Sequence, residues 1–289
     1  MTGSTKSRWL KLVTLLAAML LLAAACGEDA TETAPADDTG SSPSETEAPE
    51  FSTLEDGILQ VGSCLDYRPF EFVKDGEEQG FDVELTEAIA SRLGLEVEWV
   101  RADFDSVFEN LKAGKFDMVA AASTITEERL QVVDFSDPYF NARQGFTVNS
   151  NETPDLTSTD QLEEGDAVAV QKGTTGETWA RENLEPNGIQ IKSFTAVTGA
   201  FSDLEAGNVV GVLNDEGSSI AEAAERPGLS VVEAIDTDEH YGLAFSKDNP
   251  ELTQAANAAL AEIIADGTYA EIFSTWFPEL PVPDEYQGS

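Results

Sequence analysis

An alternation of short apolar strands with amphipathic helices restricts the fold of this 289-residue chain more than any other pattern in it. Residues 82–93 repeat apolar side chains at helical spacing and end at Gly94, a residue typical of helix ends. Strand patterns lie on either side, at residues 58–61 and 95–100. Strands that alternate with helices predict an α/β fold built on a mostly parallel sheet.

The alternation continues to residue 276 and forms two blocks of similar size. Further strands are predicted at residues 116–121, 167–170, 189–192, 209–213, 229–232 and 241–246, and further helices at residues 104–113, 175–184, 197–206, 218–224, 250–265 and 268–276. Two such blocks predict two lobes. Ligands of α/β folds bind at the carboxyl ends of the strands, so a cleft between the lobes is the expected site.

The N-terminus has the pattern of an export signal. Lys6, Arg8 and Lys11 precede an almost entirely apolar run at residues 12–25. This run is short for a membrane span and ends in small residues directly before Cys26, as a bacterial lipoprotein signal does. We therefore expect a signal peptide at residues 1–25 and lipidation of Cys26. An ordinary secretory signal that happens to end near a cysteine is the alternative.

The composition is strongly acidic. Residues 26–53 are rich in Ser, Thr, Pro, Ala and acidic residues and lack any basic one, which predicts a disordered acidic tether. The whole chain has 16 Lys and Arg against 55 Asp and Glu, and removing residues 1–25 changes its formal net charge from −39 to −42. This charge excludes a nucleic-acid partner. Simple solubility explains it, and adaptation to high salt is a second hypothesis.

Cysteine count limits the chemistry of the chain. Cys26 and Cys64 are the only two cysteines, and a lipidated Cys26 leaves Cys64 without a disulfide partner. Two cysteines exclude zinc or iron–sulfur sites built on cysteine clusters. The sequence also lacks a phosphate-binding loop and a nucleophile elbow. We expect neither a metal nor a cofactor.

Several short motifs identify a family. They are residues 67–72 (YRPFEF), 80–85 (GFDVEL), 124–129 (TITEER), 134–139 (DFSDPY), 173–175 (GTT), 241–244 (YGLA) and 265–269 (ADGTY). In their order and spacing they resemble the amino-acid-binding family of bacterial solute-binding proteins (family 3), which serve ABC importers. Each motif is weak alone, but together they cover nearly all of residues 55–278.

The resemblance implies a two-lobe fold of the type II periplasmic-binding-protein kind, in which each lobe is a mixed sheet flanked by helices. Lobe 1 would comprise residues 54–143 plus 245–289, and lobe 2 residues 144–244. Two hinge strands, near residues 143–148 and 240–245, would join the lobes.

The resemblance also implies a function. The chain would be an extracytoplasmic, lipid-anchored monomer that captures an amino acid by lobe closure and delivers it to an ABC transporter permease, and it would not be an enzyme. The alternative is a dehydratase on the same fold, similar to cyclohexadienyl dehydratases, with Asp66 or Asp215 as the general acid. A sensor partner in place of an importer stays open.

Three positions match the family's binding site for the ligand carboxylate. Arg129 matches the carboxylate-binding arginine, and a guanidinium pairs with a carboxylate through two parallel hydrogen bonds. Thr124 matches a position whose hydroxyl and backbone N–H assist. The backbone at Thr175, where a helix is predicted to start, matches a second clamp from the other lobe. The alternatives are a surface arginine paired with Glu127 or Glu128, and a simple helix cap.

Four positions match the ammonium site and the walls of the pocket. Asp215 matches the acid that binds the ligand ammonium, and Ala122 would add its carbonyl. Tyr67 and Phe104 match aromatic walls that pack on the aliphatic part of a ligand. An isolated Asp215 could instead cap the helix that follows it, and the aromatic residues could belong to the core.

Departures from the family pattern concern the ligand side chain. Cys64 stands where many relatives carry an Asp that contacts this side chain, and Asp66 stands where Thr or Ser is more usual. Gln171 and Asn214 occupy positions that could read the ligand side chain. These departures argue against a simple carry-over of basic amino-acid specificity and favour a polar uncharged ligand such as glutamine. His240, the only histidine, is expected to be structural.

Overall fold

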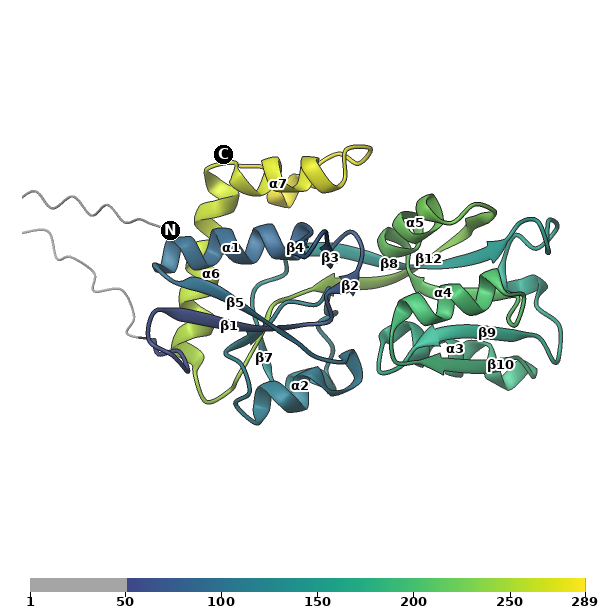
Figure 1. Cartoon of the computed structure of the whole chain (residues 1–289), viewed down its shortest axis with the longest axis horizontal. Coiled ribbons are helices and arrows are strands. Elements are labelled where there is room, and N and C mark those ends of the chain that lie inside the picture. Colours follow the sequence, from purple (N-terminus) through teal and green to yellow (C-terminus); the bar gives the residue numbers. More distant parts are fainter. Residues whose placement is uncertain (1–50, 289) are drawn as a thin grey trace, which may run out of the picture. The chain divides into compact units, whose positions relative to one another are not determined.

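The computed structural model describes residues 51–288. The predicted signal peptide, Cys26 and all but the last three residues of the predicted tether lie outside these residues. The described chain forms two α/β lobes that are joined by a pair of long strands (Figure 1). The predicted two-lobe fold, with mixed sheets flanked by helices, is confirmed by this architecture and by the solved structures compared below.

The first lobe contains a five-stranded mixed sheet. Its order is β5 (Glu96–Arg101), β1 (Ile58–Ser63), β6 (Met118–Val119), β13 (Ala244–Phe245) and β7 (Asp134–Phe135). Strand β1 is parallel to β5 and β6, whereas β13 is antiparallel to β6 and β7. The sheet is flanked by α1 (Phe81–Leu93), α2 (Phe104–Lys112) and α6 (Pro250–Ala265), and α7 (Thr268–Trp276) packs against α1 and α6 (Figure 1).

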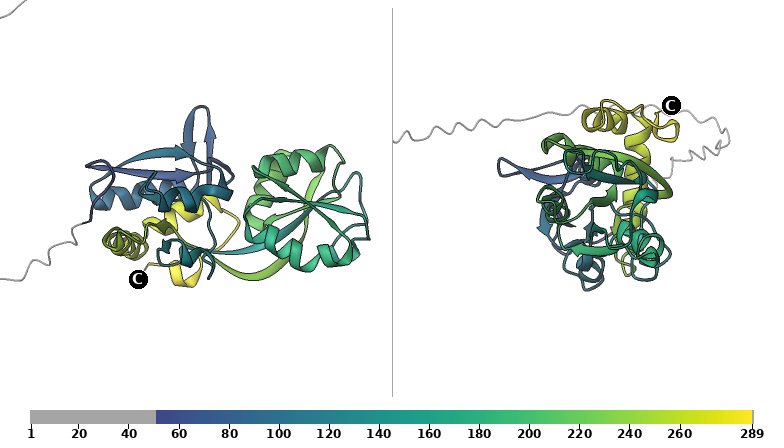
Figure 2. Two further views of the ribbon diagram at one scale, coloured as in Figure 1. Left: turned by 90° about the horizontal axis from the view of Figure 1, so that it is seen from below. Right: turned by 90° about the vertical axis from the view of Figure 1, so that its right-hand side faces the viewer.

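The second lobe repeats this arrangement. Its sheet has the order β10 (Gln190–Phe194), β9 (Ala167–Gln171), β11 (Gly211–Asp215), β8 (Phe140–Asn149) and β12 (Leu229–Tyr241). Strands β10, β9 and β11 are parallel, and β8 is antiparallel to both β11 and β12. Helices α3 (Thr175–Asn183), α4 (Val197–Glu205) and α5 (Glu216–Glu225) surround the sheet (Figure 2).

Strands β8 and β12 connect the lobes. They pair with each other from Leu229↔Asn149 to Tyr241↔Phe140. At the end of this ladder the rings of Phe140 and Tyr241 stack 5.5 Å apart, and both pack on Phe70 in the core of the first lobe. This aromatic cluster fixes the two connecting strands in the first lobe, so bending between the lobes must occur further along them.

Small elements complete the fold. A three-stranded antiparallel sheet is formed by β2 (Asp66–Tyr67), β3 (Glu71–Lys74) and β4 (Glu77–Gln79). Single turns of 3₁₀ helix lie at Arg129–Gln131, Thr159–Gln161, Glu185–Asn187 and Asp284–Tyr286.

Most predicted elements are found, but some predicted strands had the wrong bounds. Residues 229–232 are only the start of β12, which continues to Tyr241, and the predicted strand 241–246 is broken after Tyr241. The break occurs because the chain there bonds to another loop: Gly242 N–H donates to the Ser123 carbonyl (3.0 Å), and Ile125 N–H donates to the His240 carbonyl (2.8 Å). The three-stranded sheet was not predicted, since its strands are too short to show a period.

Candidate ligand-binding cleft

Two cavities lie where the lobes meet, and Arg129 borders both. The inner one has a volume of about 10 Å³, and the outer one, of about 780 Å³, opens to solvent. The inner cavity is lined by Cys64, Tyr67, Glu71, Phe104, Ala121, Ala122, Thr124, Arg129, Gln171, Thr174, Thr175 and Asp215. It therefore contains all the predicted ligand residues except Asn214, drawn from both lobes.

Arg129 lies between the two lobes without an ion-pair partner among the described residues. Its Nη1 donates to the Thr124 carbonyl (2.7 Å) and its Nη2 to the Gly173 carbonyl (3.2 Å). The guanidinium carbon lies 5.1 Å from the Phe104 ring centre and 4.9 Å from that of Phe108. Burial lowers the pKa of Arg129 to about 10, so the side chain is charged at neutral pH. Two carbonyls and two rings orient this cation without neutralising it, which leaves it able to bind an anion.

Glu239 lies beside Arg129, and it is the main residue that sequence reasoning missed. The side chain is on β12 and only 6% of the residue is exposed. Its Oε2 accepts the hydroxyl protons of Thr124 and Thr175, each at 2.6 Å. Its Oε1 accepts from Thr237 (2.6 Å) and from Gln144 Nε2 (2.9 Å). The two hydroxyls from opposite lobes are therefore joined through one carboxylate.

Asp215 is the last residue of β11 and directly precedes helix α5. Its side chain makes no helix cap, contrary to the simpler interpretation of an isolated Asp at a helix start. Instead, Tyr67 and Tyr241 donate to Oδ2 (2.7 and 2.5 Å), and Gln144 Nε2 donates to Oδ1 (2.6 Å). Burial raises the pKa of Asp215 to about 6, with Glu239 adding to the shift. A carboxylate held by neutral donors in a cleft is suited to binding a cation.

The remaining predicted residues take different places. Asn214 is buried outside the inner cavity, and its Oδ1 lies 3.0 Å from the Tyr67 hydroxyl. Gln171 lines the cavity and donates from Nε2 to the Thr195 carbonyl (3.3 Å). Ala122 has a φ of 43° and its N–H donates to Asp82 Oδ2 (2.8 Å), so a buried acid holds this loop in a left-handed conformation.

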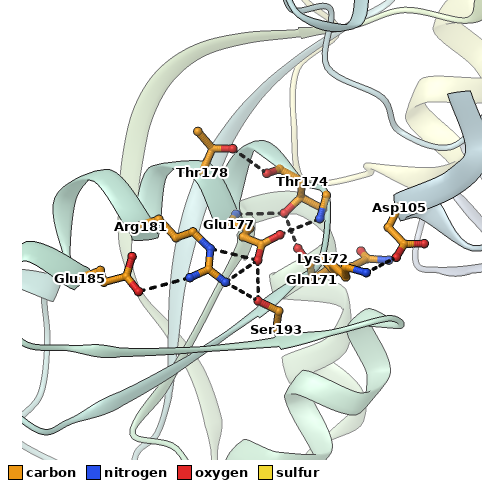
Figure 3. Close-up of polar contacts among 10 residues, drawn as sticks. Asp105, Gln171, Lys172, Thr174, Glu177, Thr178, Arg181, Glu185 and Ser193 are labelled. Atoms are coloured by element: carbon orange, nitrogen blue, oxygen red, sulfur yellow. Dashed lines mark hydrogen bonds and ion pairs between the residues drawn. The ribbon is translucent and has the colours of Figure 1, made fainter. Parts of the chain in front are cut away.

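The start of α3 is fixed by a dense network (Figure 3). Thr174 caps the helix by accepting from Glu177 N–H (3.1 Å), and the Glu177 carboxylate accepts from Gly173 N–H (2.8 Å). Just before the helix, Lys172 Nζ lies 2.8 Å from Asp105 Oδ2 of α2, so an ion pair spans the cleft from one lobe to the other (Figure 3). The cap predicted as an alternative is thus real and involves Thr174, while Thr175 points its hydroxyl to Glu239.

The outer cavity is strongly acidic. The carboxylates that line it are those of Asp105, Glu109, Glu127, Glu128, Glu182, Asp238 and Glu239, and Arg129 is the only cation among its lining residues. Such a lining creates a negative potential at the entrance of the cleft, which attracts positively charged solutes.

Residues 51–288 contain no group of three or more His, Cys, Asp or Glu side chains arranged to hold a metal ion. None of the helices formed by these residues is long and apolar enough to span a bilayer.

Comparison with known proteins identifies the family. Residues 59–279 match the family model for bacterial extracellular solute-binding proteins, family 3. The histidine-binding periplasmic protein of Escherichia coli K12 is 31% identical over 228 residues, which span 76% of this chain and 87% of that protein.

Solved structures agree. An ancestral arginine-binding protein bound to arginine has a TM-score of 0.73 and 39% identity, covering 76% of this chain and 98% of that one. An ancestral arginine-binding protein bound to glutamine has a TM-score of 0.73 and 38% identity, covering 77% and 99%. These relatives are binding proteins, which confirms the prediction of a non-enzyme and gives the dehydratase alternative less support. The chain belongs to the bacterial extracellular solute-binding proteins of family 3 and works outside the cytoplasm.

Proposed function

We propose that this protein captures a free α-amino acid in the cleft between its lobes and delivers it to an ABC transporter permease. The named relatives bind histidine, arginine or glutamine, which share an α-carboxylate and an α-ammonium but differ in side-chain charge. These names support an amino-acid ligand and leave its side chain open.

One observation carries the proposal: an unpaired guanidinium and a partly buried carboxylate from different lobes line the same cavity. Arg129 would bind the ligand carboxylate, with the Thr124 and Thr175 segments beside it, and Asp215 would bind the ammonium. Burying either charge of a zwitterion without a partner would cost several kcal/mol. A pocket that offers both partners therefore selects amino acids over simple acids and amines.

Binding requires the lobes to separate first. The inner cavity, at about 10 Å³, has room for no more than about one water molecule. The contacts that hold it closed cross between the lobes: Tyr67 to Asp215, Thr124 to Glu239, and Lys172 to Asp105. We infer a hinge motion along β8 and β12 that breaks these contacts, admits the amino acid and closes on it.

The membrane attachment is a second part of the proposal. Small residues directly precede Cys26, and an acidic stretch without basic residues separates it from the lobes. Two or more acyl chains at Cys26 would anchor the protein firmly to a membrane. Cys26→Ser should release the protein from the membrane fraction of the producing cells. Continued membrane association of that variant would contradict lipidation at this residue.

A thermal-shift screen against the common amino acids tests the function. At about 100 times Kd, a ligand should stabilise the folded protein by about 2.7 kcal/mol, which is a shift of several degrees. Arg129→Ala should abolish the shift, whereas Arg92→Ala, an arginine on α1 that lines neither cavity and pairs with Asp266, should preserve it. The absence of a shift with every amino acid would refute the proposal.

A further inference from the structure

Glu71 is the least satisfied charged group in the described chain. It begins strand β3, is 0% exposed and lines the inner cavity. Neither of its carboxylate oxygens has a hydrogen-bond partner among residues 51–288, and no ion pair joins it to a Lys or Arg in that range. A buried carboxylate without partners is costly, because it has lost its hydration and gained nothing in exchange.

The groups that face Glu71 increase this cost. Asp82 on α1, Asp66 on β2 and Asp215 on β11 all act on it with the same sign of charge. Asp66 is itself incompletely bonded, since its Oδ1 is buried and unpartnered. Arg101 is the cation that acts on Asp66, and it donates from Nε to the Cys64 carbonyl (3.1 Å) and from Nη2 to the Leu65 carbonyl (3.0 Å). The acidic groups around Glu71 therefore outnumber Arg101, and no Lys or Arg in the described chain pairs with Glu71 itself.

Asp82 shows that the fold is able to satisfy a buried carboxylate where the role is structural. It is as buried as Glu71, yet it accepts from the Tyr139 hydroxyl (2.9 Å) and from Ala122 N–H (2.8 Å). A structural Glu71 would be expected to have similar donors. The contrast indicates that the partner of Glu71 comes from outside the chain, through the cavity that it lines.

The position of Glu71 within the cavity points to the ligand side chain. Arg129, with Thr124 and Thr175, lies where the inner cavity meets the outer one, and Asp215 is placed for the ammonium. Glu71 lines only the inner cavity, together with Cys64 and Gln171, the positions that sequence reasoning assigned to the ligand side chain.

We propose that Glu71 is the subsite that selects a guanidinium side chain, so that the ligand is arginine or a close analogue. This inference rests on the proposed amino-acid-binding function and deepens it. Both oxygens of Glu71 are free, which suits the planar two-donor fork of a guanidinium better than the single point charge of an ammonium. This proposal replaces the preference for glutamine that Cys64 suggested. The acid that is absent at position 64 is supplied by Glu71 on β3.

Calorimetric titration with arginine and citrulline tests the assignment, since citrulline replaces the guanidinium by a neutral urea group of the same shape. The wild-type protein should bind arginine at least about 100-fold more tightly than citrulline. Glu71→Gln should remove most of this preference, because it weakens arginine binding and no longer penalises citrulline. Glu77→Gln makes the same chemical change on the exposed strand β4 of the same small sheet and should change neither affinity.

Four results would overturn the inference. They are equal affinity for arginine and citrulline in the wild type, tighter binding of glutamine than of arginine, tighter binding of lysine than of arginine, and an unchanged arginine preference in Glu71→Gln. The wild-type ratio decides the matter even if Glu71→Gln fails to fold. Binding of a neutral amino acid in place of arginine would leave the proposed function intact, whereas failure of every amino acid to bind would end both.

Discussion

The two ends of the cleft differ in how completely the protein satisfies its own charges. At the end where Arg129 lies, every carboxylate oxygen of Asp215 and Glu239 accepts a hydrogen bond from a Tyr, Gln or Thr side chain. At the other end, both oxygens of Glu71 are without partners.

This difference matches the chemistry of the ligand class. All amino acids share the same carboxylate and ammonium, so a binding protein gains from a rigid, fully bonded site for that part. The side chain is what distinguishes one amino acid from another, and an unpaired buried charge discriminates strongly because it penalises every ligand that cannot pair with it. The first end would therefore supply affinity for any amino acid, and the second would supply specificity.

The largest effect is expected from removing Arg129. Arg129→Ala leaves the ligand carboxylate buried without a cation, which should weaken binding of any amino acid by about 2–5 kcal/mol. Arg129→Lys should recover only part of the loss, because an ammonium cannot form the two-donor fork. Calorimetry with arginine, and with the neutral analogue of arginine that binds most tightly, should show losses of affinity of similar size. A loss confined to one of the two ligands would mean that Arg129 does not bind the common part.

Acid should weaken binding at both ends, and more at the Glu71 end. Burial raises the pKa of Glu71 well above its ordinary value, with Asp82, Asp66 and Asp215 adding to the shift, and it raises the pKa of Asp215 to about 6. A cationic group binds the ionised carboxylates, so lowering the pH through these pKa values must reduce affinity, by up to about tenfold per pH unit for each proton released.

Titrations between pH 8 and pH 5 separate the two contributions. Citrulline should report the Asp215 contribution alone, and arginine should show a steeper fall together with proton release in buffers of different ionisation enthalpy. Equal slopes for the two ligands would contradict the difference between the ends.

A moderate effect is expected where the lobes approach most closely. Gly173 has a φ of 79°, and an added Cβ would lie 3.0 Å from Asp105 Cα in the other lobe. Gly173→Ala should therefore strain the closed form and weaken binding by roughly tenfold. Gly76 has a similar φ of 88°, and no atom lies within 4 Å of an added Cβ. Gly76→Ala should therefore lower the stability of the protein without changing its affinity for the ligand. Equal ligand affinity for both variants would show that closure does not bring these backbones together.

The smallest effect is expected at the ion pair that spans the cleft. Lys172 and Asp105 have side chains 58% and 22% exposed, and exposed pairs contribute about 0–1 kcal/mol. Lys172→Ala should change affinity by no more than about threefold, and the change should disappear at high salt. A tenfold loss that persists at high salt would place Lys172 in the binding site.

Local patterns in the sequence predicted the elements well. The helices predicted at residues 250–265 and 268–276 coincide with α6 and α7, because each has a long apolar face and a clear break at its ends. The length of strand β12 was underestimated, because beyond residue 232 the strand carries many charged side chains and lacks an apolar pattern.

The candidate site could be predicted only where a motif named the residue. Glu239 bonds to the side chains of Thr124, Thr175 and Gln144, which are far away in the sequence and come together only in the folded chain. Glu71 lies inside the motif at residues 67–72. A single acid between Phe70 and Phe72 was a usable signal, but the absence of any partner for it is visible only in three dimensions.

The claim on which the account depends most is that Arg129 binds the ligand carboxylate while Glu71 binds the opposite end. The ratio of calorimetric affinities for arginine and agmatine tests it most directly, because agmatine keeps the guanidinium and lacks only the carboxylate. We predict that wild-type protein binds arginine at least about 30-fold more tightly than agmatine, and that Arg129→Ala brings this ratio close to one. Equal binding of arginine and agmatine by the wild type would contradict the account.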